Sequence, residues 1–150
     1  MITAKMIEDA KVSATHDKKE LDKRIKIAVD RYSTNENYLL HGIKRFYTIS
    51  DSSIIQLLRK LPSLLDEGYL LQPDLCRAEN RFYSLTFIKP DALLKEDLRT
   101  LRSNITDEYK NEVYQNKLKL ESLISQAHAQ YEQKTQLLAD IERMKAVIEA

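Results

Sequence analysis

The last sixty residues constrain this chain more than any other part of it. Residues 91–150 contain neither glycine nor proline, and such a stretch favours one continuous helix. Counting three polar members, the positions of its apolar stripe recur every 3.6 residues between Leu94 and Ile148, which is the α-helical period. We predict one long helix here. The alternative is a helical hairpin that turns near residues 102–107 or 125–126, where capping residues occur.

This predicted helix needs a surface to pack on. At ~1.5 Å per residue a sixty-residue helix is ~90 Å long, whereas a domain made from the other ninety residues is only ~25 Å across. The stripe therefore either packs on its own domain or pairs with another chain. From Lys117 onward its steps alternate between three and four, a heptad seam interrupted by Lys134 and Lys145. We expect a homo-oligomer, with a dimer favoured. The predicted self-association residues are Leu120, Ile124, Ala127, Tyr131, Leu138, Ile141 and Ile148.

The preceding residues predict a small domain of mixed helices and strands. The expected elements are helices over 3–14 and 17–33, a strand over 38–49, a helix over 54–67 that Pro62 kinks or splits, and a hairpin of strands 69–75 and 81–88. The predicted fold class is α+β, with about three antiparallel strands in a domain over 1–90 and a helical extension over 91–150. The expected core comprises Leu58, Leu61, Leu65, Leu85 and Phe87.

Composition excludes several classes of protein. The net charge of +1 argues against broad electrostatic binding to nucleic acid or membranes. Cys76 is the single cysteine, so an internal disulfide framework is excluded and a reducing compartment is expected. Residues 1–6 have no apolar run of the signal-peptide kind, and no stretch approaches the ~20 apolar residues of a membrane span. We expect a cytoplasmic protein with no membrane partner.

The residue types that catalysis needs are not clustered. With Gly42 and Gly68 as the two glycines, no glycine-rich phosphate loop can form. The three histidines lack metal-ligand spacing, and Cys76 has no histidine near it in sequence. We therefore predict no enzymatic activity, no metal and no cofactor.

One stretch resembles a known family. The order helix, strand, helix, hairpin continues into residues 64–70, Leu-Leu-Asp-Glu-Gly-Tyr-Leu, which resemble a recognition helix entering its wing. Residues 81–86 resemble the returning wing strand of winged-helix regulators of the PadR type. This resemblance covers residues 50–88 and implies DNA binding, with a C-terminal helix for dimerisation. The candidate nucleic-acid contacts are Gln56, Arg59, Lys60, Arg77 and Arg81. The alternative is a small α+β domain whose three strands pack on two helices.

Two functions follow from these patterns. The first is a non-catalytic protein–protein interaction protein that self-associates through its C-terminal helix. Such a protein would act as an adaptor, inhibitor or assembly factor and would bind another protein, like the accessory proteins of bacteria and phages. The second is a winged-helix-like DNA-binding transcriptional regulator, dimerised by the same helix.

Overall fold

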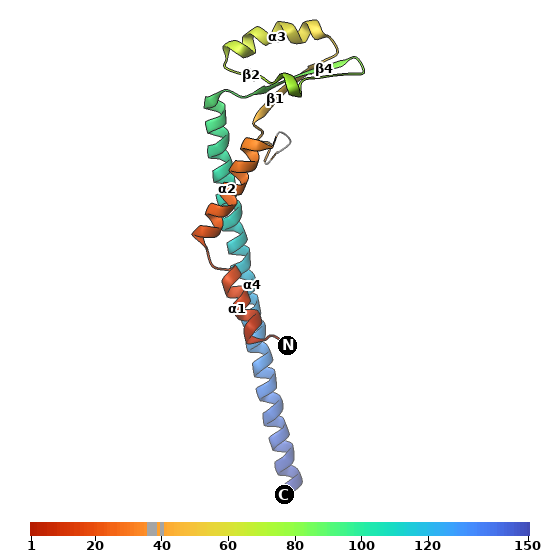
Figure 1. Cartoon of the computed structure of the whole chain (residues 1–150). Coiled ribbons are helices and arrows are strands. Elements are labelled where there is room, and N and C mark those ends of the chain that lie inside the picture. Colours follow the sequence, from red (N-terminus) through yellow and green to blue (C-terminus); the bar gives the residue numbers. More distant parts are fainter. Residues whose placement is uncertain (36–38, 40) are drawn as a thin grey trace. The chain divides into compact units, whose positions relative to one another are not determined.

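The computed structural model confirms the α+β class, with a small antiparallel sheet, three helices and a long C-terminal helix (Figure 1). It describes residues 1–35, 39 and 41–150. The elements in order are α1 (Ala4–Ser13), α2 (Lys18–Thr34), β1 (Phe46–Asp51), α3 (Ile54–Asp66), β2 (Leu70–Leu71), the 3-10 turn η1 (Pro73–Leu75), β3 (Arg77–Glu79), β4 (Phe82–Ile88) and α4 (Asp91–Glu149).

The chain forms two compact units. One unit contains residues 18–107, with the sheet, α2, α3 and the first part of α4. The other contains residues 1–17 and 108–150, with α1 and the rest of α4. That residues 1–90 would fold as a separate domain stays a prediction.

The long helix α4 is a single element of 59 residues, as favoured from the sequence, and the hairpin alternative is wrong. It starts directly after Pro90, whose carbonyl accepts hydrogen bonds from the amides of Leu93 and Leu94, both at 3.0 Å. The polar residues at 102–107 do not end it. The Thr106 hydroxyl donates to the carbonyl of Arg102 at 2.8 Å, so this side chain is satisfied within the helix.

The sheet is organised by β4, the central strand. β1, β2 and β3 each pair with β4 in antiparallel register, and the path across the sheet is β1-β4-β2. The strand predicted over 69–75 is divided, because Pro73 begins η1 and cannot donate to a ladder. The predicted loop over 76–80 is also wrong, since β3 occupies most of it. The chain instead reverses at Asn80 and Arg81, whose φ values of 48° and 64° are those of a type I′ turn.

The first strand lies further along the chain than the sequence predicted. β1 spans Phe46–Asp51, whereas the prediction was 38–49, of which residues 38 and 40 lie outside the described residues. His41 and Gly42 have φ values of 54° and 76°, and this left-handed backbone does not continue a strand. The extended pairing with β4 therefore begins only at Phe46.

Helix α3 has the ends that its sequence predicts. The Ser53 hydroxyl caps its first turn by accepting from the amide of Gln56 at 3.4 Å. At its end the amides of Gly68 and Tyr69 donate to the carbonyls of Leu65 and Leu64, both at 3.1 Å, and Gly68 has φ +92°. This is a Schellman motif, in which glycine takes the left-handed position. Pro62 lies inside the helix and does not split it.

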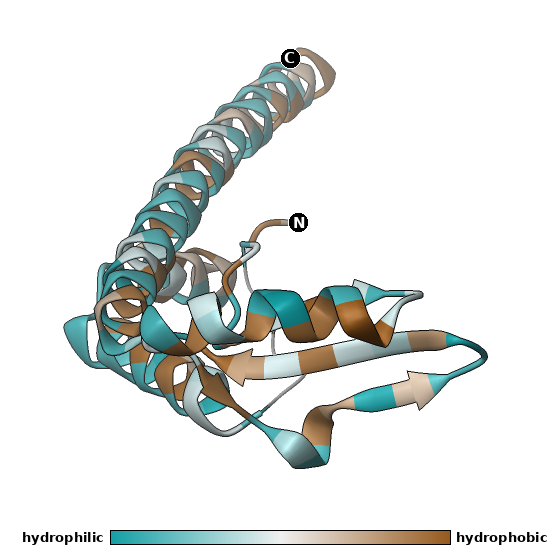
Figure 2. Ribbon diagram, turned by 90° about the horizontal axis from the view of Figure 1, so that it is seen from above, coloured by the Kyte–Doolittle hydropathy of each residue, from teal (hydrophilic) through white to brown (hydrophobic). Residues whose placement is uncertain are grey.

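Helix α3 packs on the sheet through Leu57, whereas the sequence predicted its neighbour Leu58. Leu57 and Phe87 are completely buried, whereas Leu58 and Leu65 are 51% and 47% exposed. Leu61 and Leu85 are half-buried. Neighbouring helical positions differ by about 100°, so burial of Leu57 turns Leu58 outward. Figure 2, which looks down on α3, shows hydrophobic residues along this helix and along β4. The predicted core was therefore correct for Phe87 and wrong for Leu58 and Leu65.

This difference gives a first prediction. Leu57→Ala should lower the free energy of unfolding by about 2–5 kcal/mol, because it leaves a cavity against the sheet. Leu58→Ala removes the same atoms from a half-exposed site and should cost about 1 kcal/mol. Urea denaturation of the two variants and the parent protein measures both values. Equal losses would show that α3 is rotated differently on the sheet.

Helix α2 is joined to α4 by a polar cluster within the same unit. Tyr32, only 2% exposed, donates its hydroxyl to a carboxylate oxygen of Asp97 at 2.7 Å. The ammonium of Lys89 donates to the same oxygen at 2.9 Å and forms an ion pair. Burial, followed by the hydrogen bond to Asp97, raises the pKa of Tyr32 well above its ordinary range. Apolar residues complete this part of the core, with Leu21 and Ala28 buried on α2 and Leu101 and Ile105 on α4.

The raised pKa of Tyr32 predicts a loss of stability in alkali. Below about pH 10 both the folded and the unfolded chain keep the phenol proton, so the stabilisation is complete. Above that pH only the unfolded chain releases this proton, and the free energy of unfolding should fall. Tyr32→Phe should cost about 1.5–3 kcal/mol at neutral pH, because it removes a hydrogen bond to a charged group. Its stability should also decline less between pH 9 and pH 11 than that of the parent. If the free energy of unfolding fell equally in both proteins over this range, the raised pKa of Tyr32 would be contradicted.

Candidate interaction surface

In the unit that contains the C-terminal half of α4, helix α1 packs antiparallel on this helix. The Thr3 hydroxyl caps α1 by accepting from the amide of Met6 at 3.2 Å. At one end the amide of Ile2 donates to the side-chain oxygen of Gln130 at 3.2 Å. At the other end the Tyr109 hydroxyl accepts from the amide of Asp17 at 3.0 Å. Residues 2–17, which include α1, therefore lie along α4 from about residue 109 to residue 130, and the carbonyl of Ser13 at the end of α1 accepts a hydrogen bond from the side chain of Asn116.

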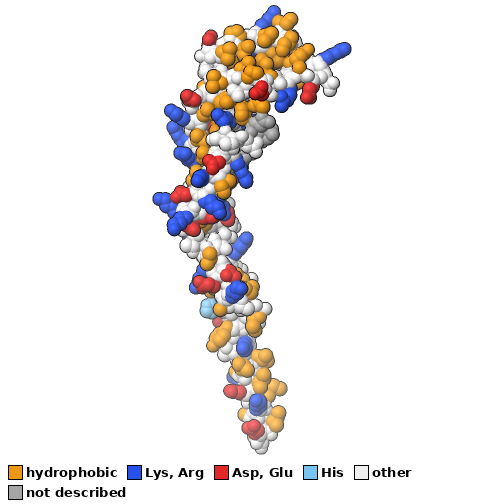
Figure 3. Space-filling view, in the orientation of Figure 1, with side chains coloured by type: hydrophobic (Ala, Val, Ile, Leu, Met, Phe, Trp, Pro, Cys, Tyr) orange, Lys and Arg blue, Asp and Glu red, His pale blue; other side chains and the backbone are white. Residues whose placement is uncertain are grey.

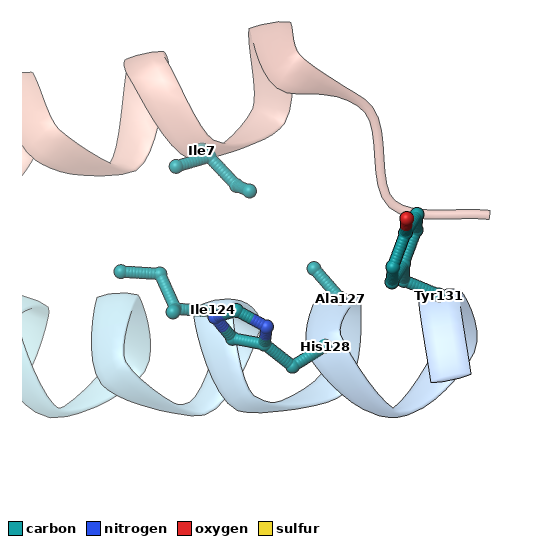
Figure 4. A pocket seen from close by; sticks show the side chains of 5 residues that line it. All are labelled: Ile7, Ile124, Ala127, His128 and Tyr131. Carbon is teal, nitrogen blue, oxygen red and sulfur yellow. The ribbon is translucent and has the colours of Figure 1, made fainter. Parts of the chain in front are cut away.

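The packing of α1 on α4 loosens toward the C-terminal end of this covered region. Tyr109 and Val113 are each only 5% exposed. Further along, the side chains of Ile7 on α1 and of Ile124 and Ala127 on α4 point toward each other across an open hollow of about 390 Å³ (Figure 4). His128 and Tyr131 complete its lining. The contact between the two helices thus ends in a partly filled space.

Beyond the segment that α1 covers, the large apolar side chains of α4 are exposed. Between 39% and 83% of the surface of each is exposed, and Figure 3 shows apolar atoms distributed along this end of the helix. We call this set the terminal stripe. Its members are Tyr131, Leu137, Leu138, Ile141, Met144, Val147 and Ile148. Tyr131 shares the hollow beside Ile7, and Leu137 lines another hollow with Met1.

The predicted self-association residues divide between two environments. Leu120, Ile124 and Ala127 are half-buried in the part of α4 that α1 covers. Helix α1 of the same chain therefore covers part of the surface that a second copy was predicted to cover. The other members, which are Tyr131, Leu138, Ile141 and Ile148, belong to the terminal stripe. Sequence reasoning missed Leu137, Met144 and Val147, which each lie one position before a residue assigned to the seam.

A second exposed apolar surface lies on α3. Side chains that the sequence placed in the core or left unassigned are exposed there: Ile54 by 40%, Ile55 by 60%, Leu58 by 51% and Leu65 by 47%. Figure 3 shows hydrophobic atoms gathered over this part of the molecule. The helix carries apolar residues around half of its circumference and buries only part of that arc on the sheet.

The candidate nucleic-acid contacts are all exposed but do not form one cluster. Gln56, Arg59 and Lys60 share the polar side of α3. Arg77 lies on β3, where its guanidinium donates to the backbone carbonyls of Asp74 and Cys76. Arg81 lies in the turn between β3 and β4. The structure thus places three of the five on one helix face.

Among the described residues, no group of three or more His, Cys, Asp or Glu residues could hold a metal ion. The Cys76 thiol donates to the carbonyl of Gln72 at 3.3 Å. Within the same described ranges, no helix combines the length and apolarity needed to cross a membrane.

Comparisons with protein-family models, curated proteins and solved structures return no match for this chain. The interaction surfaces therefore have to be interpreted from their own chemistry.

Proposed function

We propose that this chain is a non-catalytic protein–protein interaction protein that self-associates through the terminal stripe. The observation that carries this proposal is the exposure of seven large apolar side chains on the last turns of α4. A regular helix holds these side chains in fixed positions, so they present a ready surface to another helix. The roles open to such a protein are those of an adaptor, an inhibitor or an assembly factor.

The free energy available from the stripe supports association. Burying a large apolar side chain contributes roughly 1.5–3 kcal/mol, and each copy supplies seven, most of them more than half exposed. Association of two proteins costs roughly 4–15 kcal/mol in lost translational and rotational freedom. Two stripes buried against each other can therefore offset this cost.

The charges around the stripe favour a second copy as its partner. Residues 132–149 contain four acidic and three basic residues, so a second stripe meets a surface of mixed sign. A strongly charged partner would not meet a surface of opposite net charge here. The surface is therefore suited to an identical neighbour.

The proposal predicts a specific loss of assembly. Ile141→Asp places a charge on the stripe and should shift the full-length protein from dimer to monomer, because a buried unpaired carboxylate is costly. Ala146→Asp makes a comparable change on the opposite side of the same helix and should leave the dimer intact. Sedimentation velocity over a range of protein concentrations measures both. A parent protein that remains monomeric throughout this range would contradict self-association.

A DNA-binding regulator of the winged-helix kind is the second candidate. It is favoured by the order α2, β1, α3 and hairpin together with the shared exposed face of Gln56, Arg59 and Lys60 on α3. A recognition helix must present polar and basic side chains of this type to the major groove.

A mobility-shift assay at two salt concentrations tests this candidate. Binding should weaken with salt, because cationic side chains release counterions from the phosphates. The variant Arg59→Ala/Lys60→Ala should bind more weakly than the charge-matched control Lys23→Ala/Lys26→Ala, whose changes lie on α2. Equal binding by the two variants would show that α3 is not the recognition helix.

A further inference from the structure

We propose that the terminal stripes of two copies pair in parallel and in register, as a short two-stranded coiled coil. Ile141 and Ile148 take the a positions of the heptad, and Leu137 and Met144 take the d positions. This inference rests on the proposed self-association and specifies its partner and geometry. The four side chains follow steps of four, three and four residues, and they are 60%, 39%, 65% and 83% exposed in chain order.

The chemistry of these core positions favours two parallel strands. Isoleucine at a together with leucine at d is the combination that stabilises parallel dimers over higher oligomers. Methionine at the second d position is unbranched and adapts to the space available. The seam predicted from sequence placed Lys145 in the core, whereas this seam moves it to the flank.

The flanking charges are complementary in the same arrangement. With Ile141 at a, Asp140 takes position g and Lys145 takes position e. In a parallel pair, g of one helix approaches e of the other helix in the next heptad, so Asp140 faces Lys145 of the second copy, twice per dimer. Within the chain the carboxylate is 4.0 Å from Arg143 and accepts from Gln136 at 3.1 Å, and it is half exposed. It can therefore accept a further donor. An antiparallel pair would set g opposite g and would lose this match.

Helix α1 defines where the seam can begin. One heptad before Leu137, the d position falls on Gln130, whose side-chain oxygen already accepts from the amide of Ile2. Between them, Lys134 occupies an a position. A single lysine at a lowers stability but fixes register and the number of strands. The seam therefore starts after the α1 contact and continues to Ile148.

Disulfide trapping distinguishes the two directions of pairing. In the full chain with Cys76→Ser, Leu137→Cys and Ile148→Cys are prepared separately and oxidised. In a parallel pair each variant should form a linked dimer on its own, because equivalent positions face each other. In an antiparallel pair equivalent positions would be ~16 Å apart along the axis, too far for a disulfide. Only a mixture of the two variants would then link. Ala146→Cys, on the opposite side of the helix, is the control and should remain unlinked.

A charge exchange tests the flanking pair. Asp140→Lys should weaken the dimer about 2- to 30-fold, the range expected for two exposed ion pairs. Asp140→Lys/Lys145→Asp should recover most of that loss, because the pair is restored with its signs reversed. Sedimentation equilibrium gives the dissociation constants, and circular dichroism checks that the helix is retained.

The outcomes separate this inference from the function on which it rests. Linked dimers from each single cysteine variant, with rescue by the double charge variant, support the parallel pair. Linkage only in the mixture overturns the parallel pair and leaves self-association standing. Failure of the double charge variant to recover the dimer overturns the match of Asp140 with Lys145. A protein that is monomeric and unlinked in all of these experiments overturns both the inference and the proposed function.

Discussion

The apolar stripe of α4 extends beyond the described segments that pack on it within either unit, and most features of this protein follow from that constraint. In one unit the stripe is buried at Leu101 and Ile105, where α2 lies against α4. In the other unit α1 continues the cover as far as Gln130. Past this point the same stripe is exposed in every described side chain of large apolar type. The association of two copies that we propose would cover the part of this long amphipathic helix that is left exposed.

The sheet shows the same shortage of covering elements on a smaller scale. One face receives α3, and Phe87 is buried there together with Leu57. On the opposite face Thr48 and Thr86 lie side by side, with their hydroxyls 3.0 Å apart. Thr86 is buried on this face, and its hydroxyl also donates to the carbonyl of Leu75 in η1 at 3.4 Å. The outer apolar arc of α3 is the part of this layer that stays exposed among the described residues.

The sequence predicted the parts of the fold that depend on local chemistry. The absence of glycine and proline favoured a continuous α4, and Ser53 and Gly68 supplied recognisable ends for α3. It could not identify the buried side of α3, because the apolar residues span half of the circumference and the period fits several rotations equally well.

The terminal seam predicted from the sequence differs from the proposed one for a related reason. A repeat of 3.6 residues drifts ~20° per heptad from a repeat of 3.5, so following the helical period from Leu94 leads to Leu138 and Lys145. The residues beside them, Leu137 and Met144, are 60% and 65% exposed and fit the stricter repeat. The position of α1, which leaves these residues uncovered, was not available from periodicity alone.

The central place of β4 in the sheet also has a consequence for the order of folding during synthesis. β1, β2 and β3 all precede β4 in the chain, and each of them pairs with β4. A ribosome therefore releases three strands and α3 before their common partner exists. Until Ile88 has emerged, the apolar side of α3 has no completed sheet to pack on, and an incomplete chain is most exposed to misassociation in this interval. The last strand made closes the sheet in one step, and α4 follows it directly.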